Sequence, residues 1–309
     1  MSIAAERARA GSSRPSFFGR VRKEFANPEK RTAYYMVIPV LVVILLIAAW
    51  PILYGFWISF QSVTPVGSSF AGVANYTKMF TDSTFYRAML NTAVFTIVSV
   101  AIEFALGLCF ALVLNRGFRG QGVTRAIAII PWAFPTVVSA IMWRLMYQDQ
   151  VGIFAHWAEK LGLISGPILA SDTTVLIGAI LSDVWKTTPF VALLLLAGLQ
   201  TISPDVYEAS KMDGAGRWQQ FTRVTLPLLK PAILVALLFR TLDAWRVYDL
   251  FWVMSDRQLD SLSTYTFEYV RISQADVSLG NAAAIFVFLS SLVIAIAFIR
   301  FLGTRAQEA

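Results

Sequence analysis

Charged side chains inside long apolar stretches are the residues of this sequence best suited to do chemistry. Two stretches carry them at three-residue spacing: Asp183 and Lys186 in the first, and Arg240, Asp243, Arg246 and Asp249 in the second. Residues three apart are neighbours on a helix. Ionised groups in an apolar span are costly, so they either pair with one another or face a polar route.

The first stretch also holds hydroxyl groups beside a helix-breaking residue. Pro189 lacks a backbone donor and frees a carbonyl one turn earlier. Thr187, Thr188 and the ring of Trp185 would then line a route suited to a solute rich in hydroxyls. In the alternative interpretation, the charged pair at 183 and 186 only locks neighbouring helices together.

The second stretch cannot turn all its charges toward one route if it is a single helix. Each three-residue step falls about 60° short of a full turn, so Arg240 and Asp249 would lie on opposite faces. We expect Asp243 and Arg246 near the route, Asp249 at its outer rim, and Arg240 in a structural ion pair. Glu103, alone in another apolar stretch, is expected to hydrogen-bond between helices.

The sequence offers little for catalysis. His156 is the only histidine and falls in a predicted loop, and Cys109 is the only cysteine, which excludes an internal disulfide or a cysteine-ligated metal site. The sequence also has no G-x-x-x-x-G-K-[ST] phosphate-binding loop. We therefore predict a protein that is not an enzyme and that holds no metal or cofactor itself.

Composition predicts an all-α integral membrane protein. Hydrophobic residues make up 57% of the chain and charged residues 15%, with a mean hydropathy of +0.62. Continuous apolar runs of about 20 residues span a bilayer as helices, whereas barrel strands would alternate. Six spans are predicted, at Ala33–Phe60, Asn91–Leu114, Ala126–Tyr147, Thr174–Leu199, Ala232–Met254 and Asn281–Leu302.

Lysine and arginine predict the orientation of these spans. They gather in the N-terminal tail, in the connections between spans two and three and between spans four and five, and at the C-terminal end. Both termini are therefore expected on the cytoplasmic side. The net charge of +7 follows this topology and does not indicate nucleic-acid binding. The basic tail is interpreted first as an orientation signal and second as a contact for anionic membrane lipid.

The connection at residues 203–228 is predicted to contain two short helices. Ser203-Pro204-Asp205 is a typical helix start, and Asp213-Gly214 a typical helix end. A second piece is expected over Trp218–Val224. The two helices would form a knob on the cytoplasmic side of the spans.

The knob is predicted to dock into a protein partner. Its outward side would carry Glu208, Lys211 and Arg217, while its inward side would pack Val206, Ala209 and Met212 against the spans. An amphipathic loop resting on lipid headgroups is the alternative. Anionic lipid would repel the acidic residues of this segment, which favours a protein partner.

These residues carry a resemblance to a known family. Glu208-Ala209-Ser210, Asp213-Gly214-Ala215, and then Phe221, Val224, Leu226 and Pro227 resemble the EAA loop of ABC-importer permeases, with Ser210 and Val224 as departures. Val184–Phe190 looks like the fourth-span signature of the sugar branch, and Phe239–Asp249 is similar to the fifth span of maltose- and trehalose-type members. Beyond Met254, Ser255–Gln258 replaces the Gly-Gly-Pro turn common in that branch.

The resemblance implies a type I importer permease fold and a half-transporter in a bacterial or archaeal plasma membrane. Such a chain pairs with a second permease, and an extracytoplasmic binding protein delivers the solute. Two cytoplasmic ATPase subunits bind ATP and Mg²⁺ and each receive one EAA loop, here Glu208, Ala209, Ser210, Asp213, Gly214 and Ala215. The solute implied is an α-glucoside of the maltose or trehalose type, with a glycerol phosphate or a polyol left open.

Two other functions are alternatives to a half-transporter: an ion-coupled secondary transporter and a membrane enzyme. An ion-coupled secondary transporter would use Asp183, Asp243 and Asp249, but no inverted repeat is visible and six spans are few for such a fold. A membrane enzyme acting on lipid-linked sugars would need an acidic cluster at one interface, which the sequence lacks. The predicted organisation is a cytoplasmic tail at 1–32, a permease domain at 33–302 with its coupling loop at 203–228, and a cytoplasmic end at 303–309.

Overall fold

The computed structural model describes residues 28–64, 66–162, 166–256, 258–272 and 276–300. The chain divides into two units, Met1–Gly55 and Phe56–Ala309. The first contains α2 (Pro28–Ile44), a π-helical turn (Leu45–Ala49) and the beginning of α3 (Trp50–Ser59). The apolar helix Thr32–Ser59, which begins in this unit, contains an 18-residue stretch with a mean hydropathy of 2.9, as expected for a lipid-facing helix, and confirms the first predicted span.

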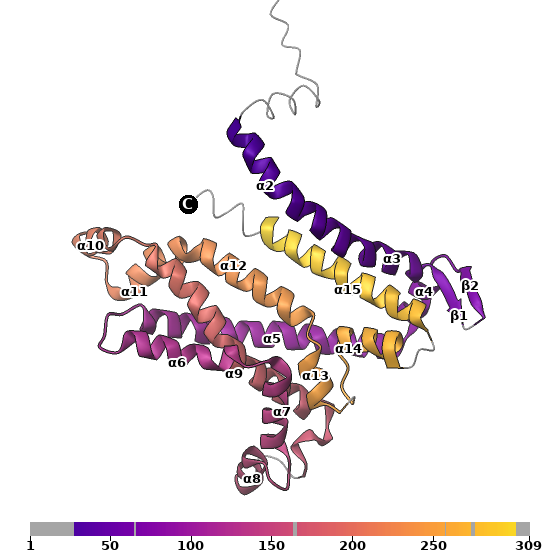
Figure 1. Cartoon of the computed structure of the whole chain (residues 1–309). Helices are drawn as coiled ribbons and strands as arrows, with labels where there is room; N and C mark the ends of the chain where they lie inside the picture. The colour runs from indigo at the N-terminus through magenta and orange to yellow at the C-terminus, as the bar shows by residue number, and fades with distance from the viewer. Residues whose placement is uncertain (1–27, 65, 163–165, 257, 273–275, 301–309) are drawn as a thin grey trace, which may run out of the picture. The chain divides into compact units, whose positions relative to one another are not determined.

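The second unit contains the rest of the described chain (Figure 1). Its first elements are the hairpin β1 (Gln61–Thr64) and β2 (Gly67–Phe70), α4 (Ala74–Thr81), α5 (Ser83–Leu114), α6 (Gln121–Ala133), α7 (Thr136–Tyr147) and α8 (Ile153–Lys160). A 3-10 turn (Ile168–Ala170), α9 (Asp172–Gln200), α10 (Pro204–Met212), α11 (Arg217–Gln220), a π turn (Phe221–Thr225) and α12 (Leu226–Trp245) follow. The last are α13 (Asp249–Met254), α14 (Leu262–Phe267), a π turn (Glu268–Ile272) and α15 (Val277–Phe298).

The span prediction is confirmed in outline. Among the described residues, five helices are long and apolar enough to cross a membrane, or six if α6 and α7 count as one bent span. Local caps extend two of them beyond the predicted limits. The carboxylate of Asp82 caps α5 by accepting from Thr84 N at 2.8 Å, so α5 begins eight residues before the predicted Asn91. α15 begins at Val277, where Asp276 Oδ1 accepts from Leu279 N.

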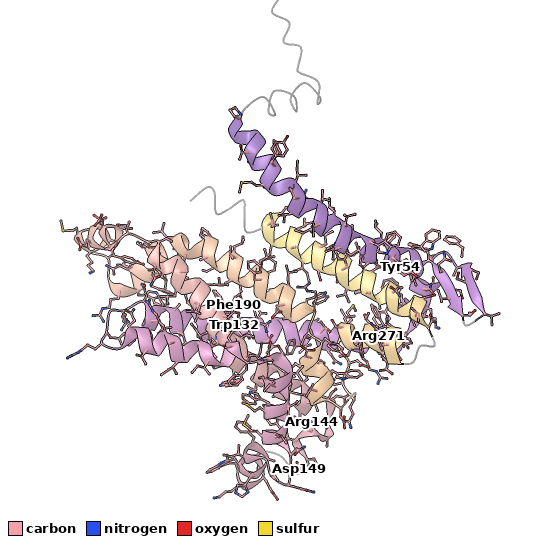
Figure 2. All side chains as sticks on the ribbon, in the orientation of Figure 1. Tyr54, Trp132, Arg144, Asp149, Phe190 and Arg271 are labelled. Atoms are coloured by element: carbon pink, nitrogen blue, oxygen red, sulfur yellow. The ribbon has the colours of Figure 1, made fainter. Side chains whose placement is uncertain are left out.

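The third span is not continuous, which corrects the prediction of one helix over Ala126–Tyr147. α6 and α7 meet at 86°. Phe134 and Pro135 adopt extended backbone angles between them, because proline disfavours a helical conformation at the residue before it. α7 is then held to α13, since Arg144 donates to Val253 O at 2.9 Å and pairs with Asp256 at 3.2 Å (Figure 2).

The fifth span also differs from the prediction over Ala232–Met254. One apolar helix runs from Arg217 to Trp245, and α13 is a separate element. Arg246 and Tyr248 leave the helical conformation, and the intervening Val247 O accepts a hydrogen bond from Ser261 Oγ at 2.7 Å. A contact with a residue 14 positions away thus accompanies a break that the apolar pattern does not show.

Three helices form the core around which the second unit is built. α5, α9 and α12 pack against one another and run side by side in Figure 1. Glycines allow the closest approaches. A Cβ at Gly107 would lie 2.8 Å from Val191 Cγ1, and one at Gly198 would lie 2.3 Å from Ala232 Cβ. α6 joins this group through Trp132, whose ring stacks on Phe190 at 5.5 Å between centroids (Figure 2).

Some predicted features fall at the edges of the described chain. The predicted tail covers residues 1–32. Its residues 1–27 lie outside the described residues, and its last five residues belong to α2, which begins at Pro28. The predicted C-terminal end, 303–309, lies outside them as well. The hairpin at residues 61–70 was not predicted. It is attached to α15 by a hydrogen bond from Val63 N to Ser278 Oγ at 3.0 Å.

The packing of α5 on α9 gives a stability prediction. We expect Gly107→Leu to lower the free energy of unfolding by about 1–3 kcal/mol, because the new side chain meets Val191 and the backbone of α9. Gly122→Leu, on α6 with nothing within 4 Å of its Cβ, is the matched control. The measurement is the thermal unfolding midpoint of the purified chain in detergent. Equal midpoints for the two variants would contradict the close packing.

Candidate solute cavity and coupling segment

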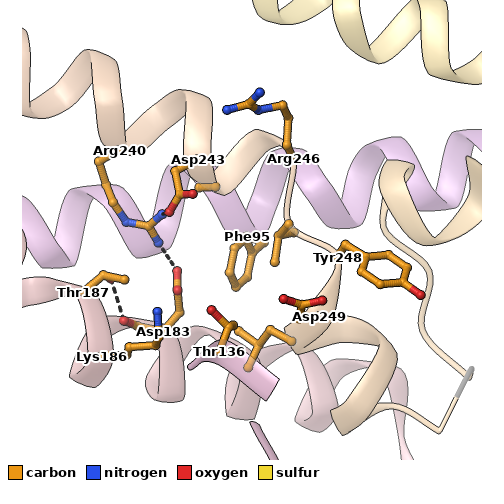
Figure 3. Close-up of a pocket in the computed structure, with 13 residues that line it drawn as sticks. Phe95, Thr136, Asp183, Lys186, Thr187, Arg240, Asp243, Arg246, Tyr248 and Asp249 are labelled. Atoms are coloured by element: carbon orange, nitrogen blue, oxygen red, sulfur yellow. Dashed lines mark hydrogen bonds and ion pairs between the residues drawn. The ribbon is translucent and has the colours of Figure 1, made fainter. Parts of the chain in front are cut away.

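A polar cavity of about 150 Å³ lies among α5, α7, α9, α12 and α13 (Figure 3). It collects six of the eight residues predicted for the solute route: Asp183, Lys186, Thr187, Asp243, Arg246 and Asp249. α9 supplies the first three. Asp243 lies on α12, Arg246 follows the end of α12, and Asp249 is the first residue of α13. The cavity is therefore lined by charged and hydroxyl groups from helices distant in the sequence.

All four charged residues of the second stretch line this cavity. This corrects the prediction that Arg240 and Asp249 would lie on opposite faces of one helix. Arg240 and Asp249 both belong to the wall. The helix ends at Trp245, and the non-helical residues up to Tyr248 redirect the chain before α13 begins at Asp249. The rotation argument holds only for an unbroken helix, so the break brings the two residues to one site.

Arg240 is the centre of a buried ionic cluster. Its Nη2 donates to Glu103 Oε1 at 2.9 Å and also contacts Asp183, its Nε contacts Glu103 Oε2, and its Nη1 donates to Asp243 Oδ2 at 2.9 Å. Arg240 and Glu103 are only 2% and 0% exposed. Glu103 thus bonds between helices and Arg240 forms a structural ion pair, and both predictions are confirmed.

Asp183 and Lys186 do not form an ion pair with each other, although their spacing would allow one. The carboxylate of Asp183 turns to Arg240 on α12, and Lys186 makes no ion pair with any described residue. A buried guanidinium is the stronger partner because its fork binds several carboxylates at once. Lys186 remains at the cavity wall with its ammonium available to a solute.

Trp185 and Thr188 lie away from the cavity. Thr188 is buried and donates to Val184 O at 2.6 Å, while the ring of Trp185 packs edge-on against Trp143 at 5.8 Å. Both face a separate apolar groove that includes Pro189. The prediction that they line the same route as Asp183 is wrong for this cavity, because successive residues of a helix point in different directions.

Sequence reasoning missed the uncharged residues of the wall. Phe95, Thr136 and Tyr248 line the cavity (Figure 3). Phe95 and Thr136 come from apolar segments, and Tyr248 lies between Arg246 and Asp249 of the charged stretch. Thr136 directly follows Pro135, so the helix break was a signal that could have pointed to it. Phe95 carries no local signal, since its place in the wall depends on how α5 packs.

The segment at residues 203–228 forms the predicted first helix. Ser203 Oγ accepts from Asp205 N at 3.3 Å at the start of α10, and Gly214 adopts φ +77° after its end. That left-handed conformation suits glycine. Two backbone hydrogen bonds close this turn. Asp213 N donates to Ala209 O and Ala215 N donates to Ser210 O, both at 3.0 Å.

Two predictions about this segment are wrong. Trp218–Val224 is not a separate short helix, because α11 continues through a π turn into α12 without a break. Such a turn accommodates Pro227, which lacks a backbone donor. The inward face is also different: Val206 and Ala209 are exposed, as is Met212, at 89% of its area.

The inward contact of α10 comes instead from Tyr207. Its hydroxyl and Thr225 Oγ1 are hydrogen-bonded at 3.2 Å, and Ser210 Oγ donates to Tyr207 O at 2.8 Å. The outward surface therefore combines the carboxylate of Glu208 with apolar Val206 and Met212. A surface of this mixed kind is typical of a protein-binding site.

Comparison with known proteins places this geometry in a family. The sequence model for "Binding-protein-dependent transport system inner membrane component" matches residues 103–308, which include the α10 segment and all of the cavity wall except Phe95. The chain belongs to this family. It is therefore a multi-pass inner membrane component of a transport system.

Two similar proteins cover almost the whole chain. The trehalose/maltose transport system permease protein MalF of Thermococcus litoralis is 40% identical over 278 residues, covering 88% of this chain and 94% of that protein. The trehalose transport system permease protein SugA of Mycobacterium tuberculosis is 37% identical over 282 residues, covering 90% of this chain and 91% of that protein. Both likenesses extend well beyond the region that the family model matches.

Solved structures show the same fold. A bacterial ABC transporter involved in the import of the acidic polysaccharide alginate matches with a TM-score of 0.74 at 24% identity, covering 94% of this chain and 99% of that chain. The same kind of transporter in complex with an alginate pentasaccharide-bound periplasmic protein matches with a TM-score of 0.75. The chain thus has the type I importer permease fold, as the resemblance implied.

The ionic cluster gives a second stability prediction. Arg240→Ala leaves the buried carboxylates of Glu103 and Asp183 without their partner, and we expect it to destabilise this inner membrane component by about 3–5 kcal/mol. Arg246→Ala is the control, because that side chain is exposed and its hydrogen bond goes to Leu242 O of its own helix. Thermal unfolding in detergent measures both. A small loss for Arg240→Ala, equal to that of the control, would count against the cluster.

Proposed function

We propose that the chain is the permease subunit of an ATP-driven carbohydrate importer and forms half of its translocation pathway. The observation that carries this proposal is the 40% identity to a trehalose/maltose permease over 94% of that protein's length. The proposed solute is a di- or oligosaccharide such as an α-glucoside. The second relative, a trehalose permease at 37% identity, supports the same class.

The composition of the cavity is consistent with a solute rich in hydroxyl groups. Its wall carries the carboxylates of Asp243 and Asp249 and the cationic groups of Lys186 and Arg246. These groups provide both donors and acceptors for hydroxyl groups. The proposed solute-contacting set is Asp183, Lys186, Thr187, Asp243, Arg246 and Asp249, from which Trp185 and Thr188 are left out.

The proposed assembly contains a second homologous permease, two cytoplasmic ATPase subunits and an extracytoplasmic binding protein. The family description, binding-protein-dependent transport, supports the last of these. ATP and Mg²⁺ would be bound by the ATPase subunits. The half-transporter would face its ATPase with the α10 segment on the cytoplasmic side. The distribution of Lys and Arg supports this side for α10 and for both termini.

The coupling set within this segment is Glu208, Ala209, Ser210, Asp213, Gly214 and Ala215. Glu208 is exposed and offers its carboxylate to donors on the ATPase. Gly214 shapes the chain reversal that follows α10. Tyr207 anchors α10 to the first turns of the long helix that ends at the cavity, so movement of α10 is passed to that helix.

Transport by the reconstituted complex tests the pathway. We expect Lys186→Ala and Asp243→Ala each to lower uptake of a trehalose or maltose tracer by about tenfold or more, since each loses a hydrogen-bonding charge at the cavity wall. Lys160→Ala, an exposed residue of α8, should transport normally. Uptake is measured in liposomes holding the permeases and the ATPase, with binding protein presented against a panel of sugars. Normal uptake by both cavity variants, or uptake of none of the sugars, would refute the proposal.

Coupling is tested separately. We expect Glu208→Ala and Gly214→Val to leave membrane insertion intact but to weaken co-purification of the ATPase or to abolish sugar-stimulated ATP hydrolysis. The Glu208 change removes a charged acceptor, and a valine at φ +77° is strained. Gly117→Val, at a glycine with ordinary φ and open space around it, is the control. Wild-type values for both variants in both assays would show that α10 is not the coupling element.

A further inference from the structure

Glu103 lies one layer behind the wall of the cavity. It is fully buried on α5 and does not line the cavity itself. Its carboxylate instead binds two residues that do. The hydroxyl of Thr187 shares its one proton between Glu103 Oε1 and the backbone oxygen of Asp183, both at 2.6 Å, and Arg240 reaches both carboxylate oxygens of Glu103 through Nε and Nη2.

Arg240 connects the buried Glu103 to Asp243 at the exposed side of the wall. A guanidinium is planar and its donors keep a fixed fork geometry. Because Glu103 holds the Nε–Nη2 edge, the direction of Nη1 is set, and Nη1 donates to Asp243 Oδ2 at 2.9 Å. The side chain of Asp243 is 73% exposed, and Figure 3 shows it next to Arg240 with Asp183 opposite.

An exposed aspartate normally samples several rotamers. A site that recognises hydroxyl groups gains from having its acceptors fixed before the solute arrives, because less freedom is then lost on binding. Among the described residues, Arg240 is the ion-pair partner that can fix Asp243, and Glu103 is what orients Arg240 from behind.

We propose that Glu103 is a positioning residue for solute transfer, acting through Arg240 to hold the Asp243 carboxylate at the cavity wall. This inference rests on the proposed function of the cavity. A role in folding alone predicts something different: it would change the amount of assembled complex but not the transport rate of each assembled complex.

The test is a double-mutant cycle in the reconstituted transporter, with rates expressed per assembled complex. Glu103→Gln removes the charge and turns an amide donor toward Arg240, which itself only donates. We expect its maximal uptake rate to fall about tenfold, as for loss of a charge-assisted hydrogen bond. The half-saturating concentration of sugar-loaded binding protein should stay within about twofold, because docking occurs elsewhere.

Asp243→Asn should lower the maximal rate as well, and adding Glu103→Gln to it should cost less than about twofold more, since both changes act through one carboxylate. Glu103→Asp should restore part of the rate. Ser99→Ala is the matched control: it lies one turn earlier on α5, is fully buried, and its hydroxyl has no hydrogen-bond partner among the described residues. Its rate should equal that of the wild type.

Other outcomes overturn the inference in distinguishable ways. Losses that multiply in the double variant, or a wild-type rate for Glu103→Gln, would refute positioning while leaving the cavity assignment intact. A wild-type rate for Asp243→Asn would refute a role of the Asp243 charge in transport, and the inference with it, whereas the cavity assignment is decided by Lys186→Ala together with Asp243→Ala. If Glu103→Gln does not assemble, Arg240→Lys takes its place in the cycle, because a single ammonium cannot hold both carboxylates in the same geometry. Failure of both to assemble would assign Glu103 to folding.

Discussion

The buried guanidinium of Arg240 is the interaction on which the arrangement of the central helices depends. It contacts Glu103 on α5, Asp183 on α9 and Asp243 on its own helix, α12. A charge inside a membrane protein is tolerated only when it is paired or hydrated, so these three helices must meet at this level. Close approaches at Gly107 and Gly198 let α5 and α12 reach α9 near enough for the side chains to join.

The ionic cluster also connects the two functional regions. The helix that carries Arg240 runs from Arg217, just after the α10 segment, to Trp245 at the cavity. α9, which carries Asp183, ends at Gln200, just before that segment. Two of the three helices that enter the cluster, α9 and α12, therefore flank α10. A displacement of α10, the segment proposed to contact the ATPase, would then act on the cavity through these two helices.

Many features of the chain follow from local sequence. Continuous apolar length predicts the spans, because a helix satisfies its own backbone in lipid and the strands of a barrel would alternate. Ser203, Pro204 and Gly214 predict the limits of α10, because caps and left-handed turns depend on a few adjacent atoms. The gathering of Asp183, Lys186, Asp243 and Arg246 at one cavity could also be predicted, since charged residues in apolar spans have few other places to go.

By itself, the sequence determined the class of fold, the family and the position of the α10 segment, because each depends on composition or on contacts within a few residues. Only the tertiary structure decided which partner Asp183 takes, where the third and fifth spans break, and which face of α10 turns inward. Each of these depends on distant groups: Arg240 competes with Lys186, Ser261 binds the chain after Trp245, and Thr225 binds Tyr207. Residues 57, 14 and 18 positions apart meet only once the helices have packed.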